Sequence, residues 1–164
     1  SATGRRHPPA GSDYFVFRRG EFADIPGFAL GRAGWDNWMI YAARAGGMAV
    51  VDATDSVTII HQTHDYGHLP GGQPHYRLPE SEANVRLAGG REMIFTLKDA
   101  TWRLGPGGLH RQRLSPAGLA RTLEAALAAR LGPGRASRWL RLLSHPAETL
   151  RYFIGRAKGR INPA

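Results

Sequence analysis

Cysteine is absent from this chain of 164 residues, and no run of apolar residues is long enough to cross a membrane. The absence of cysteine excludes disulfides, thiolate metal sites, iron–sulfur clusters and cysteine nucleophiles. A membrane-spanning helix needs about 20 consecutive apolar residues, so a transmembrane helix of the usual kind is also excluded. The glycine motifs of a P-loop, of a dinucleotide-binding fold and of a serine nucleophile elbow are missing as well, so none of those three sites has a recognisable setting.

Acidic residues are scarce in the last third of the chain, and this scarcity accounts for the whole net charge of +9. Residues 1–110 hold 11 Lys and Arg against 11 Asp and Glu, whereas residues 111–164 hold 11 Lys and Arg against only 2 acidic residues. A neutral body with a basic tail differs from a uniformly basic domain. We therefore predict two parts, a body over residues 1–108 and a basic helical extension over residues 109–164.

Turn-forming residues divide the body into short elements, since the chain contains 21 Gly and 11 Pro. Apolar residues recur at helical spacing from Trp35 to Ala42, which predicts a helix over 35–45 that ends at Gly46-Gly47. Compact apolar runs predict strands at 13–17, 48–51, 57–60, 93–97 and 101–104, the last two joined as a hairpin. A short helix is predicted over 81–87, and C-terminal helices over 115–130, 135–143 and 145–159. The predicted fold class is α/β, a small mixed sheet covered by the first helix, with a C-terminal helical extension.

A carboxylate stands in the first turn of the predicted 35–45 helix, directly after a glycine-bearing loop over residues 25–34. The positive end of the helix dipole stabilises such an anion, and the carboxylate would face whatever the loop encloses. Asp36 is therefore a candidate catalytic residue. The alternative is that Asp36 only starts the helix, and that Trp35 and Trp38 belong to the core.

Three histidines and an aspartate follow the predicted strand 57–60 within eight residues: His61, His64, Asp65 and His68. Loops at strand ends commonly deliver metal ligands or acid–base groups. The spacing of His61 and His64 is not that of a zinc-finger pair, and no cysteine is available to complete one. Two alternatives stay open here, a His/Asp metal hydrolase and a polar loop whose histidines bond to the backbone.

Three segments together resemble the C-terminal half of bacterial glycosyltransferase-like proteins, relatives of the family 2 nucleotide-sugar transferases with the GT-A fold. They are Asp13-Tyr-Phe-Val-Phe17, the stretch 25–38 that ends in Trp-Asp-Asn-Trp, and Val51-Asp-Ala-Thr54 followed by a stretch over 57–66 that contains His-Gln-Thr-His-Asp-Tyr. The similarity covers roughly residues 10–104. It implies a partial GT-A-like fold, and transfer of a sugar from a nucleotide-sugar donor to a hydroxyl of a saccharide or lipid-linked acceptor.

The resemblance also implies roles for individual residues. Asp36 matches the acid that takes the proton of the acceptor hydroxyl in inverting members, a step that a carboxylate can perform. Substrate contacts are implied for Trp35 (as a platform for the sugar), Asn37 and Asp13. His61 or, failing that, His64 would bind the divalent cation, Mn²⁺ or Mg²⁺, that offsets charge on the leaving diphosphate.

One expected part of that family is missing, because the chain has no Asp-x-Asp motif and no room for a nucleotide-binding half before residue 13. We therefore expect the chain to be the acceptor-side portion of a transferase, a fragment that turns over nothing alone. The first residue is Ser rather than Met, which fits excision from a longer chain or N-terminal processing. The expected location is the cytoplasm, with peripheral contact at the inner face of the membrane.

Arginines alternate with leucines and aromatic residues through 115–160. Basic amphipathic helices of this composition lie on anionic membrane surfaces, which is the reason to expect peripheral membrane contact. The alternative is a helical cap with a solvated arginine face, and nucleic acid is not an expected partner because no reading motif is present. The rival function is a non-catalytic module that binds a saccharide or an anionic surface through Trp35, Trp38 and the arginines.

Overall fold

The computed structural model describes residues 8–12, 14–60, 67, 78–131, 140 and 144. The chain divides into two compact units, Ser1–Arg113 and Leu114–Ala164. The division falls just beyond the predicted end of the body at residue 108, because strand β3 (Gly108–Arg111) still pairs with the sheet of the first unit.

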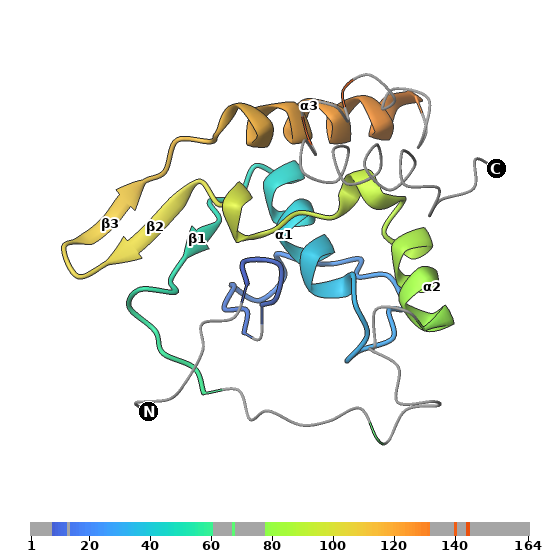
Figure 1. Cartoon of the computed structure of the whole chain (residues 1–164), viewed down its shortest axis with the longest axis horizontal. Coiled ribbons are helices and arrows are strands. Elements are labelled where there is room, and N and C mark those ends of the chain that lie inside the picture. The colour runs from blue at the N-terminus through green and yellow to red at the C-terminus, as the bar shows by residue number, and fades with distance from the viewer. Residues whose placement is uncertain are drawn as a thin grey trace, which may run out of the picture. The chain divides into compact units, whose positions relative to one another are not determined.

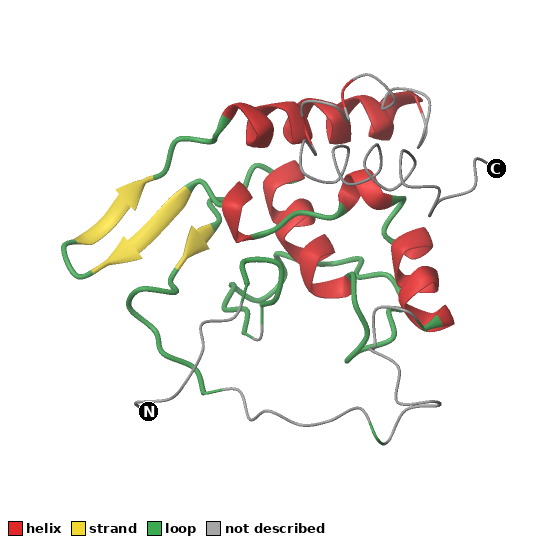
Figure 2. Ribbon diagram, viewed as in Figure 1, coloured by secondary structure: helices red, strands yellow, loops and turns green. Residues whose placement is uncertain are grey.

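The first unit holds a small mixed sheet of three strands in the order β1-β2-β3 (Figure 1). Strand β1 (Val51–Asp52) runs parallel to β2 (Trp102–Gly105), and β2 turns back as an antiparallel hairpin with β3. The hairpin closes where Gly105 lies opposite Gly108, whose φ of 101° favours glycine. Figure 2 shows these strands together with the helices and loops. The predicted α/β class with a small mixed sheet is confirmed.

Helix α1 (Trp35–Ala45) has the bounds that its apolar spacing predicts. Gly34 precedes it with a φ of 105°, a conformation that side chains rarely adopt. Met39 and Ile40 are each 3% exposed and form the buried face of the helix. The ring of Tyr41 meets the buried Phe95 edge-on, with 5.4 Å between ring centroids. This core fixes the position of the first turn of α1, which carries the candidate residues.

Two predicted strands, at 13–17 and 57–60, are wrong, because residues 14–17 and 57–60 have irregular backbone. Val16 is fully exposed, at 101%, and Ile60 is 81% exposed. A run of aromatic or β-branched residues forms a strand only where a neighbouring strand and a packed face support it. Within the described part of the chain, these runs have no such partner strand.

The strand predicted at 93–97 is also wrong, because this stretch contains the end of one 3₁₀ turn and the start of another. These turns are η3 (Arg91–Met93) and η4 (Leu97–Asp99). A capping box favours the second turn, in which the Asp99 carboxylate accepts the Thr96 N–H at 3.0 Å. The predicted hairpin between 93–97 and 101–104 is therefore replaced by the β2–β3 hairpin.

Helix α2 (Pro79–Leu87) confirms the short helix predicted over 81–87 and begins slightly earlier. Pro79 occupies its first position, where the missing N–H costs no hydrogen bond. The buried residues of α2 are polar, Ser81 and Asn84, so this helix packs through hydrogen bonds rather than through an apolar stripe.

The second unit contains helix α3 (Pro116–Leu131), which confirms the helix predicted over 115–130. The hydroxyl of Ser115 accepts the Gly118 N–H at 3.1 Å and caps the first turn, as the sequence predicts. Further along, the buried Glu124 carboxylate accepts a hydrogen bond from the Ser144 hydroxyl at 2.5 Å. Among the described helices, none combines the length and the apolar character that crossing a bilayer requires.

Candidate functional site

The first turn of α1 presents Asp36, whose carboxylate is half-buried. Burial raises the pKa of the Asp36 carboxyl above its ordinary value, and hydrogen bonds from backbone N–H groups only partly offset this effect. These N–H groups belong to Asn37, Ser12, Asp36 itself and Gly34. The carboxylate therefore sits at the positive end of α1 and also joins the segment 8–12 to the helix.

Trp35 borders a cavity of about 600 Å³ in the first unit. Its wall is formed largely by aromatic and aliphatic side chains, among them Tyr14, Phe15, Phe17, Phe28, Trp35 and Met39. The ring of Phe15 lies 5.8 Å from that of Trp35, tilted by 56°. None of the lining residues within the described part of the chain is charged, and Asp36 is not one of them.

The loop that forms one side of this cavity is held by Asn84 of α2, which is fully buried. The Asn84 amide accepts the Ala29 N–H at 2.9 Å and donates to the carbonyls of Ala29 at 3.0 Å and Ala33 at 3.2 Å. Sequence reasoning missed Asn84, because a lone asparagine on a short polar helix carries no signal of burial. Its long-range partners become visible only once α2 is placed beside the loop.

Asn37, which the resemblance implies as a substrate contact, is 9% exposed. Its amide nitrogen donates to the carbonyls of Phe95 at 2.8 Å and Ala10 at 3.0 Å. Two amide hydrogens are thus engaged by two backbone segments, and Asn37 joins both segments to the start of α1. A substrate role for Asn37 stays a prediction, and the contacts show a positioning role.

The remaining candidates, Asp13, His61 and His64, lie outside the described residues, as do Asp65 and His68. Within the described ranges, no group of three or more His, Asp or Glu residues could hold a metal ion. The metal role predicted for His61 or His64 therefore stays a prediction. The structure brings together Trp35, Asp36 and Asn37 in the first turn of α1.

Comparison of the chain with protein-family models, with curated proteins and with solved structures found no match in any of the three.

Proposed function

We propose that this chain supplies the acceptor side of a glycosyltransferase, which moves a sugar from a nucleotide-sugar donor to an acceptor hydroxyl. The proposal depends on one juxtaposition. A cavity of about 600 Å³ with aromatic walls lies beside the helical turn that carries a carboxylate of raised pKa.

The cavity suits a saccharide in size and in chemistry. Its volume lies within the range of about 300–1,000 Å³ typical of small-molecule sites. The flat faces of Trp35 and Phe15 offer apolar surface for the C–H face of a sugar ring, while sugar hydroxyls keep their contact with water at the open side. Trp35 is the lining residue next to Asp36 in the chain, so an acceptor stacked there lies beside the start of α1.

The carboxylate of Asp36 can accept the acceptor's hydroxyl proton in this proposal. As the acceptor oxygen forms its bond to the sugar's anomeric carbon, the bond from that carbon to the diphosphate breaks, and the proton passes to Asp36. A raised pKa brings a carboxyl group closer to the working pH, which favours proton uptake in the transition state. The divalent metal implied by the resemblance stays outside this step, because its ligands His61 and His64 are not described.

A specific observation favours a second candidate, a module that binds saccharide without catalysis. The Asp36 carboxylate accepts backbone hydrogen bonds, one of them from Ser12, and it does not line the cavity. In that case Asp36 is a structural link between α1 and residues 8–12, and only the aromatic cavity acts on the ligand.

Two measurements test the proposal and separate these candidates. Free mono- and disaccharides are titrated into the chain by NMR, and we expect Trp35→Ala to weaken binding by at least about tenfold. Trp102→Ala is the matched control, since Trp102 belongs to β2 and does not line this cavity. Equal saccharide binding by wild type and Trp35→Ala would show that the aromatic cavity is not the saccharide site.

In the full-length protein, Asp36→Asn should lower sugar transfer by about 100-fold or more, the usual size of a general-base effect, with nucleotide-sugar binding unchanged. Retained transfer would exclude Asp36 as the base. Saccharide binding without any transfer by the wild-type full-length protein would favour the binding module.

A further inference from the structure

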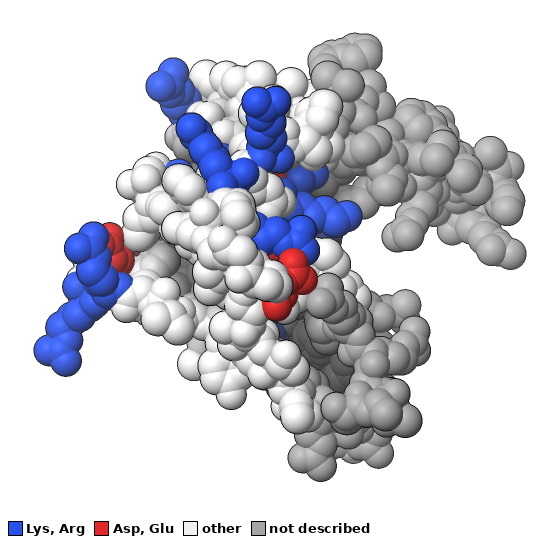
Figure 3. Space-filling view, turned by 90° about the vertical axis from the view of Figure 1, so that its left-hand side faces the viewer, with Lys and Arg blue, Asp and Glu red and all other residues white. Residues whose placement is uncertain are grey.

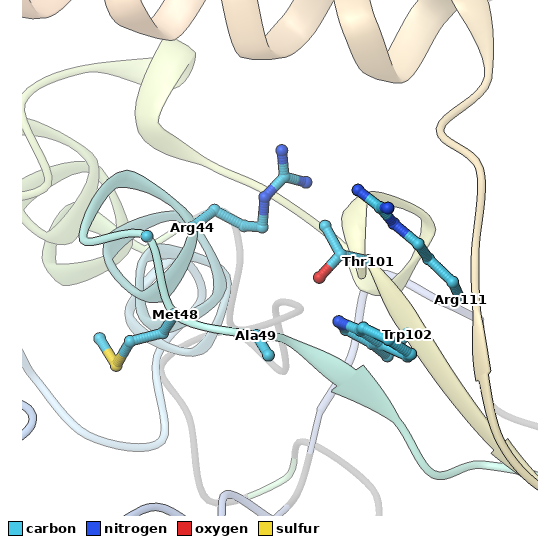
Figure 4. A pocket seen from close by; sticks show the side chains of 7 residues that line it. Arg44, Met48, Ala49, Thr101, Trp102 and Arg111 are labelled. Carbon is cyan, nitrogen blue, oxygen red and sulfur yellow. The ribbon is translucent and has the colours of Figure 1, made fainter.

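A second cavity, of about 260 Å³, lies in the first unit between the end of α1 and the sheet (Figure 4). The labelled side chains that line it are Arg44, Met48, Ala49, Thr101, Trp102 and Arg111. Two of the lining residues are arginines, and none of those that the structure describes is acidic. Figure 4 shows the guanidinium groups of Arg44 and Arg111 extending toward each other above Thr101.

Each arginine is placed by its own element. Arg44 belongs to the last turn of α1 and donates a hydrogen bond to the backbone carbonyl of Asp99. Arg111 ends β3 directly opposite Trp102 of β2, and residues opposite each other in a sheet share one face. Arg103, the next residue along β2, is instead paired with Asp55, Nε to Oδ2 at 2.7 Å, and does not line the cavity.

The C-terminal end of α1 would ordinarily repel an anion, because the exposed carbonyl oxygens of a helix C-terminus carry partial negative charge. Here the last carbonyls are capped by the residues that follow the helix. The Ala42 carbonyl accepts the Gly46 N–H at 2.9 Å, and the Ala43 carbonyl accepts the Met48 N–H at 2.9 Å. The Arg44 carbonyl accepts the Gly47 N–H at 3.1 Å. This Schellman arrangement, with Gly47 at a φ of 75°, weakens the negative pole beside the cavity.

We propose that this cavity binds a phosphate group, presented by a small phosphate monoester or by a lipid headgroup. Guanidinium forks bind phosphate oxygens through paired, charge-assisted hydrogen bonds, and Arg111 can present such a fork here. Arg44, which also donates to the Asp99 carbonyl, adds a second positive charge beside it. The indole N–H of Trp102 adds a neutral donor at the floor of the cavity (Figure 4). The cavity is smaller than a typical ligand site, so it takes the phosphate and little of what the phosphate is attached to.

This phosphate site is separate from the aromatic cavity beside Asp36, since the two have no described lining residue in common. Figure 3 shows exposed Lys and Arg side chains among the described residues, and exposed cations favour the approach of anions. The phosphate site and the proposed saccharide site can therefore fail independently of each other.

The test uses inorganic phosphate and glycerol 1-phosphate, titrated into the chain at constant ionic strength set with sodium chloride. The readout is the ¹⁵N-indole NMR signal of Trp102, assigned with Trp102→Phe. We expect saturable binding, weakened at least about tenfold by Arg111→Gln and less strongly by Arg111→Lys, which keeps the charge but loses the fork. Arg91→Gln is the matched control, an exposed arginine outside the cavity, and should leave binding unchanged.

Arg111 is exposed, so its replacement should not disturb folding, whereas Arg44→Gln also removes a bond to Asp99 and serves only as a second variant. Vesicles of phosphatidylcholine with and without phosphatidate identify the source of the phosphate. Arg111-dependent binding to phosphatidate vesicles indicates a lipid headgroup, and binding of the soluble monoester alone indicates a soluble ligand. No saturable shift with any probe, or equal weakening by Arg111→Gln and Arg91→Gln, would overturn the proposal.

Discussion

Asn84 holds the peptide groups on both sides of Ala29, accepting the Ala29 N–H at 2.9 Å and donating to the Ala29 carbonyl at 3.0 Å. A third bond reaches the carbonyl of Ala33 at 3.2 Å. The loop over residues 25–34 has no regular hydrogen-bonding pattern of its own, so this side chain takes the place of a strand partner. The wall of the aromatic cavity therefore depends on helix α2.

We predict that Asn84→Ala lowers the free energy of unfolding by about 2–4 kcal/mol, because three backbone groups lose their partner in a partly buried place. Urea denaturation measures this loss. Glu82→Ala, an exposed change on the same helix, is the control and should stay within about 0.5 kcal/mol of wild type. Similar stabilities of the two variants would show that water replaces the amide without cost.

Gly47 adopts a φ of 75° at the end of α1, and a Cβ built there meets nothing within 4 Å. Gly47→Ala should therefore destabilise the chain by about 1 kcal/mol through backbone strain alone. Gly27 has equally open surroundings without the left-handed φ, so Gly27→Ala should be neutral or slightly stabilising. Thermal unfolding of the two variants compares the effects directly, and equal stabilities would contradict the role given to Gly47.

The stability of the chain should depend on pH through Asp36. Burial raises the pKa of this carboxyl in the folded state above its unfolded value near 3.8, so the folded state binds the proton more tightly. The contribution of the protonated Asp36 carboxyl to the free energy of unfolding is complete below pH 3.8 and is lost as the pH rises through the pKa of the folded state. The free energy of unfolding of wild type relative to Asp36→Asn should therefore fall across this interval.

Chemical denaturation at a series of pH values measures the difference between wild type and Asp36→Asn. The asparagine replaces one acceptor oxygen by a donor, which costs stability, but this cost does not titrate. The test therefore depends on how the difference in unfolding free energy changes with pH, and not on its size at any one pH. A difference that rises with pH would show that the backbone hydrogen bonds to Asp36 outweigh its burial.

Sequence reasoning located those elements whose signals are local. The bounds of α1 follow from the spacing of Trp35 to Ala42 and from the glycines at each end, and Ser115 marks the start of α3. The strands at 57–60 and 93–97 were mispredicted because strand formation depends on partners distant in sequence.

The same limit applies to the sites. Trp35 and Asp36 stand out in the sequence because their motif is compact, and the structure places Trp35 on the wall of a cavity. Arg44 and Arg111 are far apart in the chain, and only the pairing of β2 with β3 and the end of α1 bring them to one cavity. Asn84 likewise acquires its role from contacts across more than 50 residues.

Helix α3 leads to a prediction about the second unit, because its leucines lie on the exposed side. Leu119 is 58% exposed and Leu123 51%, whereas the buried positions are Gly118, Glu124, Ala125 and Ala128. The segment 111–164, which contains the helix, carries 11 Lys and Arg against 2 acidic residues. An anionic lipid surface matches both features, since it accepts leucine side chains and attracts arginines.

We therefore expect the chain to sediment with vesicles that contain phosphatidylserine, and to release them as salt screens the attraction. The double change Leu119→Ser and Leu123→Ser should weaken this binding by about tenfold or more. Two leucine side chains that enter the lipid surface contribute about 3 kcal/mol or more to the free energy of binding. Ala120→Ser and Thr122→Ser, conservative changes on the same helix, are the control pair. Unchanged vesicle binding by the leucine variant would mean that the arginines alone hold the surface, and no binding by wild type would exclude membrane contact through α3.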